Sequence, residues 1–224
     1  MSRNDWTELF GSDDEQYDIK QPIITFETIP GLKLIRQGLD HEQQMALVHA
    51  LADRNYFSGP DNNQAMIFGK LPSFIDWICP WIIQNYPDLF HADILNREPL
   101  FDQAILNMYK KGEGITSHVD LLRFEDGIII ISLLSSCVMK MRPARSKATS
   151  YAIPNHAPSY DILLRPGDIL ALSKEARYNW EHGIDHTTMD EYNGEYIQRN
   201  TRISVTLRKL VHTNHESEVS LGTR

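Results

Sequence analysis

Four consecutive isoleucines occupy positions 128–131, and the largely apolar run around them extends from Gly127 to Met139. β-Branched side chains lose conformational freedom in a helix and pack well in a pleated sheet, so the run predicts a buried β-strand. It is also shorter than the ~20 apolar residues that a membrane-spanning helix needs. We therefore expect a water-soluble chain built around a sheet.

The second half of the chain contains further segments with strand character. Residues 101–120 hold two extended runs around a glycine-containing turn, and residues 160–173 carry a Pro-Gly-Asp sequence typical of a hairpin. Residues 201–210 alternate apolar and polar side chains, as in a strand with one buried face. Short strands of this kind, preceded by helices, predict a mainly β fold of the sandwich or barrel type with N-terminal helices.

The clearest helix is expected over residues 40–57. Asp40 is a good N-cap residue, and Gln43 stands three positions later, as in a capping box. Apolar residues then recur at helical spacing: Met45, Leu47, Val48, Leu51 and Ala52. Residues 29–38 predict a short strand before this helix, whereas the segment from residue 60 predicts a loop that leads into a second helix at about Pro72.

Charge, cysteine content and the chain ends limit the class of protein. The 224 residues carry a formal net charge of -8, with a pI near 5.6, which argues against nonspecific coating of nucleic acids. Cys79 and Cys137 form no C-x-x-C pair, so neither a disulfide framework nor a zinc finger is expected. The acidic N-terminus lacks both the apolar core of a secretory signal and the arginine-rich character of a transit peptide. We expect a nuclear or cytoplasmic protein that does not associate with membranes.

His118 and Asp120 stand two positions apart, just before the isoleucine run. On a strand, side chains at i and i+2 leave the same face, so an imidazole and a carboxylate would converge there. A third ligand is needed, and His182 in the next strand-rich segment is the best candidate. Two histidines and one carboxylate form the ligand set of nonhaem Fe(II) oxygenases. Zinc is the competing metal, but the sequence lacks an H-E-x-x-H motif.

The strand expected over residues 201–210 brings polar groups to one of its faces. Period-2 alternation assigns four residues to that face: Arg202, Ser204, Thr206 and Arg208. A guanidinium binds a carboxylate through two parallel hydrogen bonds and stays charged when partly buried, so two arginines on one face suit a dicarboxylate. Asn107 and Tyr109, also two positions apart, can both hydrogen-bond a carboxylate oxygen.

Four motifs in this order resemble the AlkB-like family of Fe(II)/2-oxoglutarate dioxygenases: N-x-Y at 107–109, H-x-D at 118–120, RYNWEHGI at 177–184 and R-x5-R at 202–208. The resemblance covers residues 100–210 with the full motif set and, more weakly, residues 29–48 and 62–72. It implies a double-stranded β-helix, or jelly roll, in which the isoleucine run is a strand between two sheets. It also implies Fe(II) bound by His118, Asp120 and His182. The implied 2-oxoglutarate ligands are Asn107, Tyr109, Arg202 and Arg208, with Arg202 at the distal carboxylate. Ser204 stands between the two arginines, where the bacterial prototype has a second asparagine, and is a further candidate ligand.

The same resemblance implies a reaction and a range of substrates. Such enzymes use O2 to oxidise a C–H bond while 2-oxoglutarate becomes succinate and CO2, and hydroxylation of an N-methyl group leads to demethylation. Repair-type members place acidic residues after H-x-D, where this chain has Leu121 and Leu122, so it is more similar to members that act on tRNA or have no settled nucleic-acid substrate. An alkylated or modified base in RNA or DNA is the first substrate hypothesis. A basic nuclear, histone-like protein is the alternative, and a binding module without activity is the third.

Four regions are expected: a flexible acidic arm at 1–22, an N-terminal extension with helices and a candidate substrate lid at 23–100, the dioxygenase jelly roll at 101–211, and a disordered tail at 212–224. The candidate lid residues are aromatic, because an extruded base is held by stacking: Tyr56, Phe57, Phe68, Trp77 and Trp81. Trp77 and Trp81 are spaced i, i+4, which equally fits core contacts of one helix. A basic loop that could contact phosphates, or simply be solvated, contains Lys140, Arg142, Arg145 and Lys147.

Overall fold

The computed structural model describes residues 20–59, 62–144 and 159–211. The strands are β1 (Ile23–Thr25), β2 (Leu32–Ile35), β3 (Gln64–Phe68), β4 (Gln103–Tyr109), β5 (Ile115–His118), β6 (Ile128–Leu133), β7 (Cys137–Pro143), β8 (Tyr160–Leu164), β9 (Ile169–Leu172), β10 (Trp180–Ile184), β11 (Met189–Tyr192), β12 (Glu195–Gln198) and β13 (Arg202–Arg208). The helices are α2 (His41–Asp53), α3 (Ser73–Asp76), α4 (Ile78–Asn85), α5 (Ala92–Leu95) and α6 (Lys174–Tyr178).

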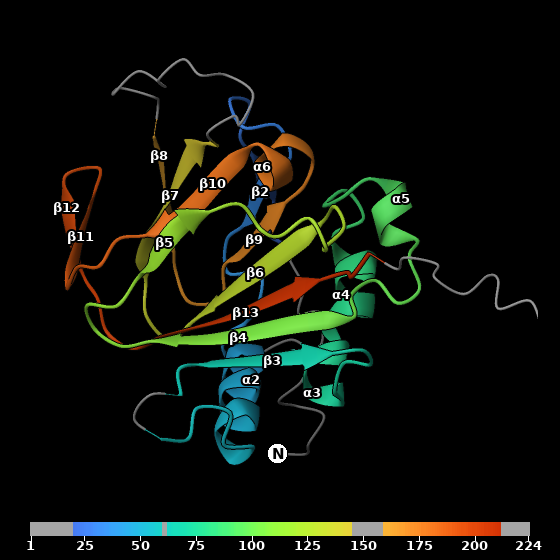
Figure 1. Cartoon of the computed structure of the whole chain (residues 1–224), viewed down its shortest axis with the longest axis horizontal. Coiled ribbons are helices and arrows are strands. Elements are labelled where there is room, and N and C mark those ends of the chain that lie inside the picture. Colours follow the sequence, from blue (N-terminus) through green and yellow to red (C-terminus); the bar gives the residue numbers. More distant parts are fainter. Residues whose placement is uncertain (1–19, 60–61, 145–158, 212–224) are drawn as a thin grey trace, which may run out of the picture.

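Two antiparallel sheets form the body of the protein (Figure 1). The large sheet has the strand order β1-β2-β9-β6-β13-β4-β3, and the small sheet has the order β5-β10-β7-β8. β11 and β12 pair only with each other, in a hairpin that projects from one end of the sheets (Figure 1). This architecture confirms the predicted mainly β, jelly-roll fold with N-terminal helices.

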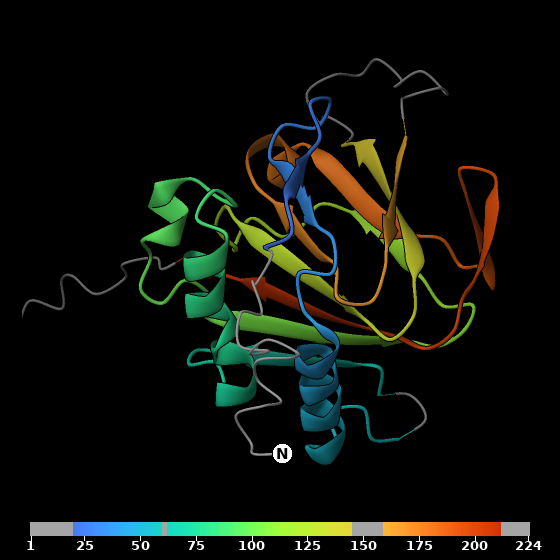
Figure 2. The same ribbon diagram turned by 180° about the vertical axis from the view of Figure 1, so that it is seen from behind.

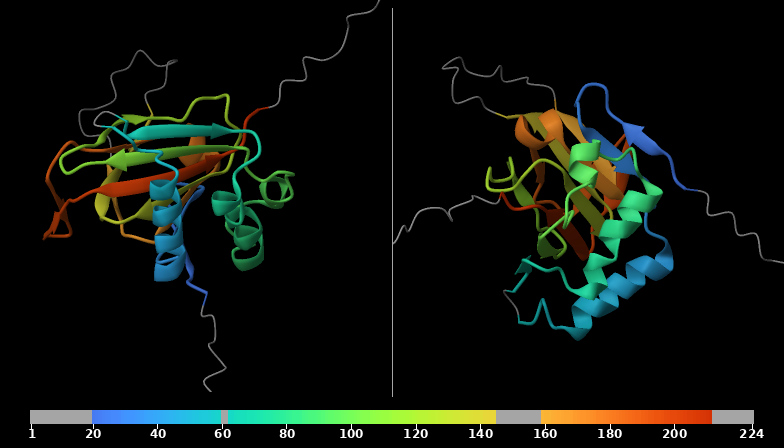
Figure 3. Two further views of the ribbon diagram at one scale, coloured as in Figure 1. Left: turned by 90° about the horizontal axis from the view of Figure 1, so that it is seen from below. Right: turned by 90° about the vertical axis from the view of Figure 1, so that its right-hand side faces the viewer.

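The isoleucine run forms β6, which lies in the middle of the large sheet and is buried on both faces. Ile129 and Ile131 pack into a core shared with α2, α3 and α4. Ile128 and Ile130 pack into a second core, which the large sheet shares with the small one. Figures 2 and 3 show the three helices along the outer side of the large sheet. The run therefore separates two apolar layers.

The predicted helix over residues 40–57 is confirmed as α2, and its start is fixed by a capping box. The carboxylate of Asp40 accepts from the backbone N–H of Gln43 at 2.7 Å, and the Gln43 side chain accepts from the Asp40 N–H at 3.0 Å. The predicted second helix is confirmed as well, because α3 begins directly after Pro72 and α4 follows it. No helix in the described part of the chain is long and apolar enough to cross a membrane.

Two details of the predicted strand arrangement are wrong. Residues 160–173 are not a hairpin, since β8 pairs in the small sheet and β9 in the large sheet. The buried carboxylate of Asp168 holds this crossing by accepting from the Arg36 side chain and from the N–H groups of Gln37 and Arg165. The segment after residue 60 is not all loop, because it contains β3. Ala65 and Ile67 of β3 pack against the outer core, which is the core that the large sheet shares with α2, α3 and α4.

The N-terminal region contributes directly to the large sheet, because β1, β2 and β3 are all strands of it. Most of the predicted acidic arm and the whole predicted tail, at 212–224, lie outside the described residues, as do Arg145 and Lys147 of the predicted basic loop.

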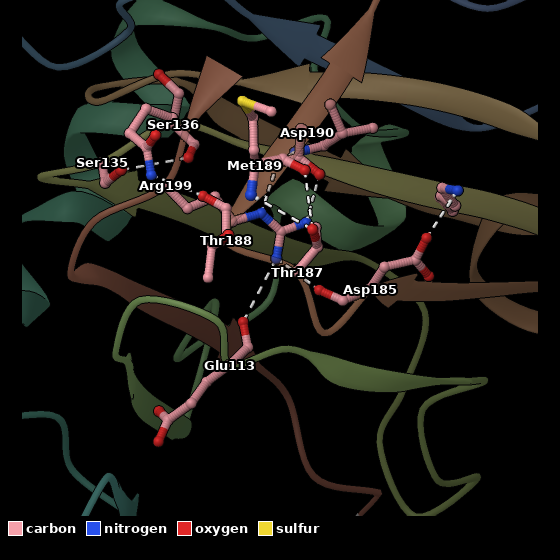
Figure 4. Close-up of polar contacts among 12 residues, drawn as sticks. Glu113, Ser135, Ser136, Asp185, Thr187, Thr188, Met189, Asp190 and Arg199 are labelled. Atoms are coloured by element: carbon pink, nitrogen blue, oxygen red, sulfur yellow. Dashed lines mark hydrogen bonds and ion pairs between the residues drawn. The ribbon is translucent and has the colours of Figure 1, made fainter. Parts of the chain in front are cut away.

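A buried ion pair anchors the β11–β12 hairpin to the sheets (Figure 4). Arg199 binds the carboxylate of Asp190 through two hydrogen bonds and also donates to the backbone oxygens of Asp185 and Glu113. Asp190 in turn accepts from the backbone N–H of Val138 in β7. One side chain thus ties together the segments that precede β5, follow β10 and precede β13.

Candidate active site

His118, Asp120 and His182 come together between the sheets. His118 ends β5 and is the cross-strand partner of His182 in β10, with the ring centroids 4.5 Å apart. Asp120 lies two residues beyond the end of β5, and its carboxylate is 3.6 Å from Nε2 of His182. One ligand atom from each residue lies within 4.8 Å of the others, so the three side chains could hold a metal ion.

The surroundings of these side chains favour the protonation states that bind a cation. Burial lowers the pKa of His182 to about 4, so the ring is neutral at pH 7 and its nitrogen lone pair is free. Burial alone would raise the pKa of Asp120, but His182 and Arg208 outweigh that effect and the pKa is lowered. Nδ1 of His118 lies 2.8 Å from the backbone oxygen of Thr116, and a hydrogen bond donated there leaves Nε2 as the ligand atom.

The same cavity contains the polar faces of β4 and β13. It is lined by the three residues above together with Asn107, Tyr109, Arg202, Ser204, Thr206 and Arg208. The two strands pair in register, with Ser204 opposite Asn107 and Arg202 opposite Tyr109. The period-2 prediction for β13 is therefore confirmed, and every residue predicted for the site lines one cavity.

Arg202 has the features of an anion-binding residue. Its side chain is buried, its Nε donates to the hydroxyl of Ser132 at 3.0 Å, and its guanidinium lies 5.4 Å from the centre of the Tyr109 ring. Its Nη2 is buried and has no hydrogen-bond partner among the described residues. A buried donor without an acceptor is costly, and a carboxylate would satisfy it. The donor set at this end of the cavity thus fits 2-oxoglutarate.

Arg208, in contrast, is already engaged. It forms an ion pair with the carboxylate of Asp120, its Nε donates to the side chain of Gln103 at 2.7 Å, and it stacks 4.1 Å from the centre of the Phe124 ring. These three contacts fix Arg208 beside the candidate metal ligands. The two arginines therefore occupy different ends of the cavity, and of these two it is Arg202 that has a buried donor without a partner in the described structure.

Residues 77–208 match the family model described as the 2OG-Fe(II) oxygenase superfamily. The chain belongs to this superfamily. The description of the family implies Fe(II), 2-oxoglutarate and O2, and the His-Asp-His cluster fits the metal.

The curated proteins to which this oxygenase is similar include two with ALKBH8 in their names. It is 34% identical over 146 residues to the uncharacterized protein L905 of Acanthamoeba polyphaga mimivirus, covering 63% of this chain and 60% of that protein. It is 34% identical over 152 residues to the "Alkylated DNA repair protein ALKBH8 homolog" of Arabidopsis thaliana, covering 63% and 42%. The mouse protein named "tRNA (carboxymethyluridine(34)-5-O)-methyltransferase ALKBH8" is 24% identical over 182 residues, covering 72% and 25%. The matches thus span less than two thirds of each of these relatives.

The solved structure of OsALKBH1 has a similar fold. It superposes with a TM-score of 0.57 at 12% identity, covering 84% of this chain and 100% of that one. Identity this low supports the fold alone, and the fold agrees with the jelly roll described above.

Three residues at the site of the oxygenase were missed by sequence reasoning. Ser132 ends the isoleucine run and reaches Arg202 because β6 and β13 are neighbours. Gln103 supports Arg208, and Gln64 lines the cavity from β3. Local periodicity carries no signal for them, because each depends on which strands lie side by side.

A fourth missed residue, Arg177 in α6, holds the loop after the candidate metal ligand. This buried guanidinium donates to the backbone oxygens of Asp120, Leu121 and Phe124 at 2.8 to 3.0 Å. The side chains of Leu121 and Leu122 remain exposed at 60% and 78%. Arg177 therefore fixes a loop that presents two apolar side chains to solvent.

The structure separates the candidate lid residues into two groups. Four pack against the outer core and not toward the cavity: Tyr56, Phe57, Trp77 and Trp81. Trp77 and Trp81 contact each other edge to face at 6.0 Å, in agreement with the core alternative. Phe68 is 52% exposed on β3 and shares a face with Gln64, a cavity residue, by period 2. Of the five, only Phe68 remains a candidate for substrate contact.

Half of the predicted basic loop is described, and its two residues differ. Lys140 in β7 forms a 2.7 Å ion pair with Asp185, whereas Arg142 is exposed. An ammonium already paired with a carboxylate is a weaker phosphate ligand than a free one. The predicted loop is wrong for these residues, because both belong to strand β7, and they give only limited support to phosphate binding.

Proposed function

We propose that this protein is an Fe(II)- and 2-oxoglutarate-dependent dioxygenase that hydroxylates or demethylates an alkylated or modified nucleic-acid base, with release of succinate and CO2. The observation that carries the proposal is the shared cavity, which combines a His-Asp-His cluster with a buried arginine that has an unsatisfied donor. Membership of the 2OG-Fe(II) oxygenase superfamily supports it.

In the proposed site, His118, Asp120 and His182 hold the metal. Fe(II), when bound with 2-oxoglutarate and O2, supplies the oxidising power that converts a C–H bond of the substrate to C–OH. The role of the protein is to keep His182 neutral and Asp120 ionised, so that all three ligands are available at pH 7. Arg208 holds one oxygen of Asp120 and leaves the other on the side of His182.

The proposed site for 2-oxoglutarate lies along β4 and β13. Arg202 binds the distal carboxylate through its free Nη2, and Tyr109 lines the cavity beside it. Asn107 donates to a carboxylate oxygen from the same wall. Apolar side chains complete the lining and exclude water from the reacting groups: Ile105, Ile115, Ile130, Met139 and Ile184.

A flat, partly apolar substrate is supported by the surface beside the cavity. β3 pairs with no strand of the small sheet. The face of β3 that carries Gln64 also carries Met66 and Phe68, which are 48% and 52% exposed. The loop after Asp120 exposes Leu121 and Leu122. Exposed aromatic and apolar side chains suit a base by stacking, as in enzymes that act on extruded bases. Relatives whose names refer to tRNA and to alkylated DNA favour the same class.

A basic protein, such as a histone-like nuclear protein, is the second candidate substrate. The net charge of -8 favours it, because an acidic protein attracts a basic partner and repels the phosphates of a nucleic acid. The chemistry at the metal would be the same for both substrates.

The proposal is tested by supplying the purified protein with Fe(II), ascorbate, 2-oxoglutarate and O2, together with modified RNA, modified DNA or basic proteins. We expect a modified oligonucleotide to raise succinate formation and to gain oxygen or lose a methyl group by mass spectrometry. Phe68→Ala should lower this substrate-dependent turnover, whereas Tyr196→Ala, at a 70% exposed position on the hairpin, should leave it unchanged. Oxidation of the basic proteins alone would establish the second candidate.

A further inference from the structure

Gln64 makes a hydrogen bond that determines how Asn107 faces the cavity. Its side-chain Nε2 donates to Oδ1 of Asn107 at 2.7 Å. The two residues are directly opposite each other on the paired strands β3 and β4, and both line the cavity that contains the His-Asp-His cluster. The contact is partly buried, so the amide of Asn107 has a fixed partner on one side.

The direction of this hydrogen bond has a chemical consequence. A carboxamide presents an acceptor oxygen and a donor NH2 group in different directions. Because Gln64 occupies the oxygen of Asn107, the NH2 group is left for the cavity. A carboxylate of 2-oxoglutarate would meet donors there, whereas the reversed amide would present an oxygen to it and repel it.

The Gln64–Asn107 pair also forms a wall. A second cavity opens beside the first, and both are lined by Gln64, Asn107, Tyr109 and Ile115. The second cavity continues to the polar side chains of Asn63, Glu113 and His186 near the β4–β5 connection. The two hydrogen-bonded amides thus lie where the two cavities share their lining.

We propose that Gln64 is a positioning residue for the co-substrate: it directs the NH2 group of Asn107 toward a carboxylate of 2-oxoglutarate. This inference rests on the proposed binding of 2-oxoglutarate beside Asn107. It also gives β3 two roles, since Met66 and Phe68 lie on the same face of that strand at the proposed substrate surface.

The decisive variant is Gln64→Glu, which keeps the shape of the side chain but can only accept. Asn107 must then donate to residue 64 and turn its oxygen to the cavity. Asn63→Asp is the matched control, because it introduces the same charge at the neighbouring residue, which lines only the second of the two cavities. Gln64→Met removes the hydrogen bond without reversing it, so its effect should lie between those of the wild-type and Gln64→Glu proteins.

The measurement is calorimetric binding of 2-oxoglutarate to the full chain loaded with Mn(II), which replaces Fe(II) without turnover. We expect Gln64→Glu to weaken binding about tenfold, Asn63→Asp by less than about threefold, and neither to change the affinity for Mn(II). In an Asn107→Ala background, Gln64→Glu should have less than about a twofold effect, because the group through which it acts is missing.

Three results would overturn the inference: unchanged affinity in Gln64→Glu, an equal loss in Asn63→Asp, or the same tenfold loss in the Asn107→Ala background. Each of them leaves 2-oxoglutarate binding by the wild-type protein intact. If the wild-type protein loaded with Mn(II) does not bind 2-oxoglutarate, the proposed function itself fails and the role of Gln64 fails with it. Equal thermal unfolding midpoints establish that the variants are folded.

Discussion

The Nε of Arg202 donates to the hydroxyl of Ser132, and this contact between β13 and β6 turns the rest of the guanidinium toward the cavity. Because Ser132 accepts from Nε, the buried Arg202 keeps a hydrogen bond although its Nη2 has no partner within the described structure. One edge of the guanidinium is held by the sheet, and the other is left for a ligand. The fold thus builds an anion site from two adjacent strands.

Replacing Arg202 should remove this anion site and spare the metal ligands. We expect Arg202→Met to weaken 2-oxoglutarate binding by at least about 100-fold, because a buried, charge-assisted contact is lost. Metal affinity should be unchanged. Calorimetry with Mn(II)-loaded protein measures both, and Arg142→Met, at an exposed position, is the control. Normal 2-oxoglutarate affinity in Arg202→Met would remove Arg202 from the site.

The metal-free protein should lose stability between pH 6.5 and 4. The pKa of His182 is about 4 in the folded protein and 6.5 without the fold, so only the unfolded state is protonated in this range. The contribution is complete above pH 6.5 and decreases as the pH falls, by roughly 3 kcal/mol at pH 4. Urea unfolding at several pH values measures it. His182→Gln should flatten this dependence, and an identical slope in that variant would show that other groups cause it.

Arg177 should be needed for stability and for the arrangement of Asp120. Arg177→Met leaves three backbone oxygens without their donor, and we expect the free energy of unfolding to fall by about 2–4 kcal/mol. Arg177→Lys should lose less, since it keeps the charge and part of the hydrogen bonding. Metal affinity should fall in the same order. Arg165→Met, at an exposed position, should change neither quantity; a wild-type free energy of unfolding in Arg177→Met would contradict the assignment.

The Arg199–Asp190 ion pair should show strong coupling. Arg199→Met leaves a buried carboxylate without its partner, which costs about 3–5 kcal/mol. The double variant Arg199→Met/Asp190→Asn should be less destabilised than the sum of the single variants, because it has no uncompensated charge. Denaturant unfolding of the four proteins measures the coupling energy, and additive effects would show that the pair contributes no interaction.

Both thiols should be unreactive in the native protein. Burial raises the pKa of Cys79 to about 11 and also raises the pKa of Cys137, so at pH 8 neither forms appreciable thiolate. We expect a disulfide reagent such as DTNB to modify neither thiol until the protein is unfolded, and then to modify both. Rapid reaction of one thiol in the native protein would contradict this, and Cys79→Ala would identify it.

The sequence predicted what depends on neighbouring residues along one strand. Period-2 alternation placed Arg202 and Arg208 on one face of β13, and the capping residues placed the start of α2. Ser132 and Gln64 were not predictable in this way, because their contacts require the pairing of β6 with β13 and of β3 with β4. The hairpin predicted from the Pro-Gly-Asp sequence at 166–168 was wrong for the same reason. These residues do predict a turn, but the chain passes from one sheet to the other because Asp168 contacts residues that are distant in the sequence.

The most direct test of the central claim is Fe(II)-dependent release of CO2 from 2-oxoglutarate labelled at its 1-carboxylate, measured for the wild-type protein and for Asp120→Ala. We predict release by the wild-type protein that requires Fe(II) and O2, yields an equal amount of succinate and is abolished in the variant. Equal release by both proteins would contradict the assignment of Asp120. No release by the wild-type protein, together with no binding of metal or 2-oxoglutarate, would contradict the proposed dioxygenase activity.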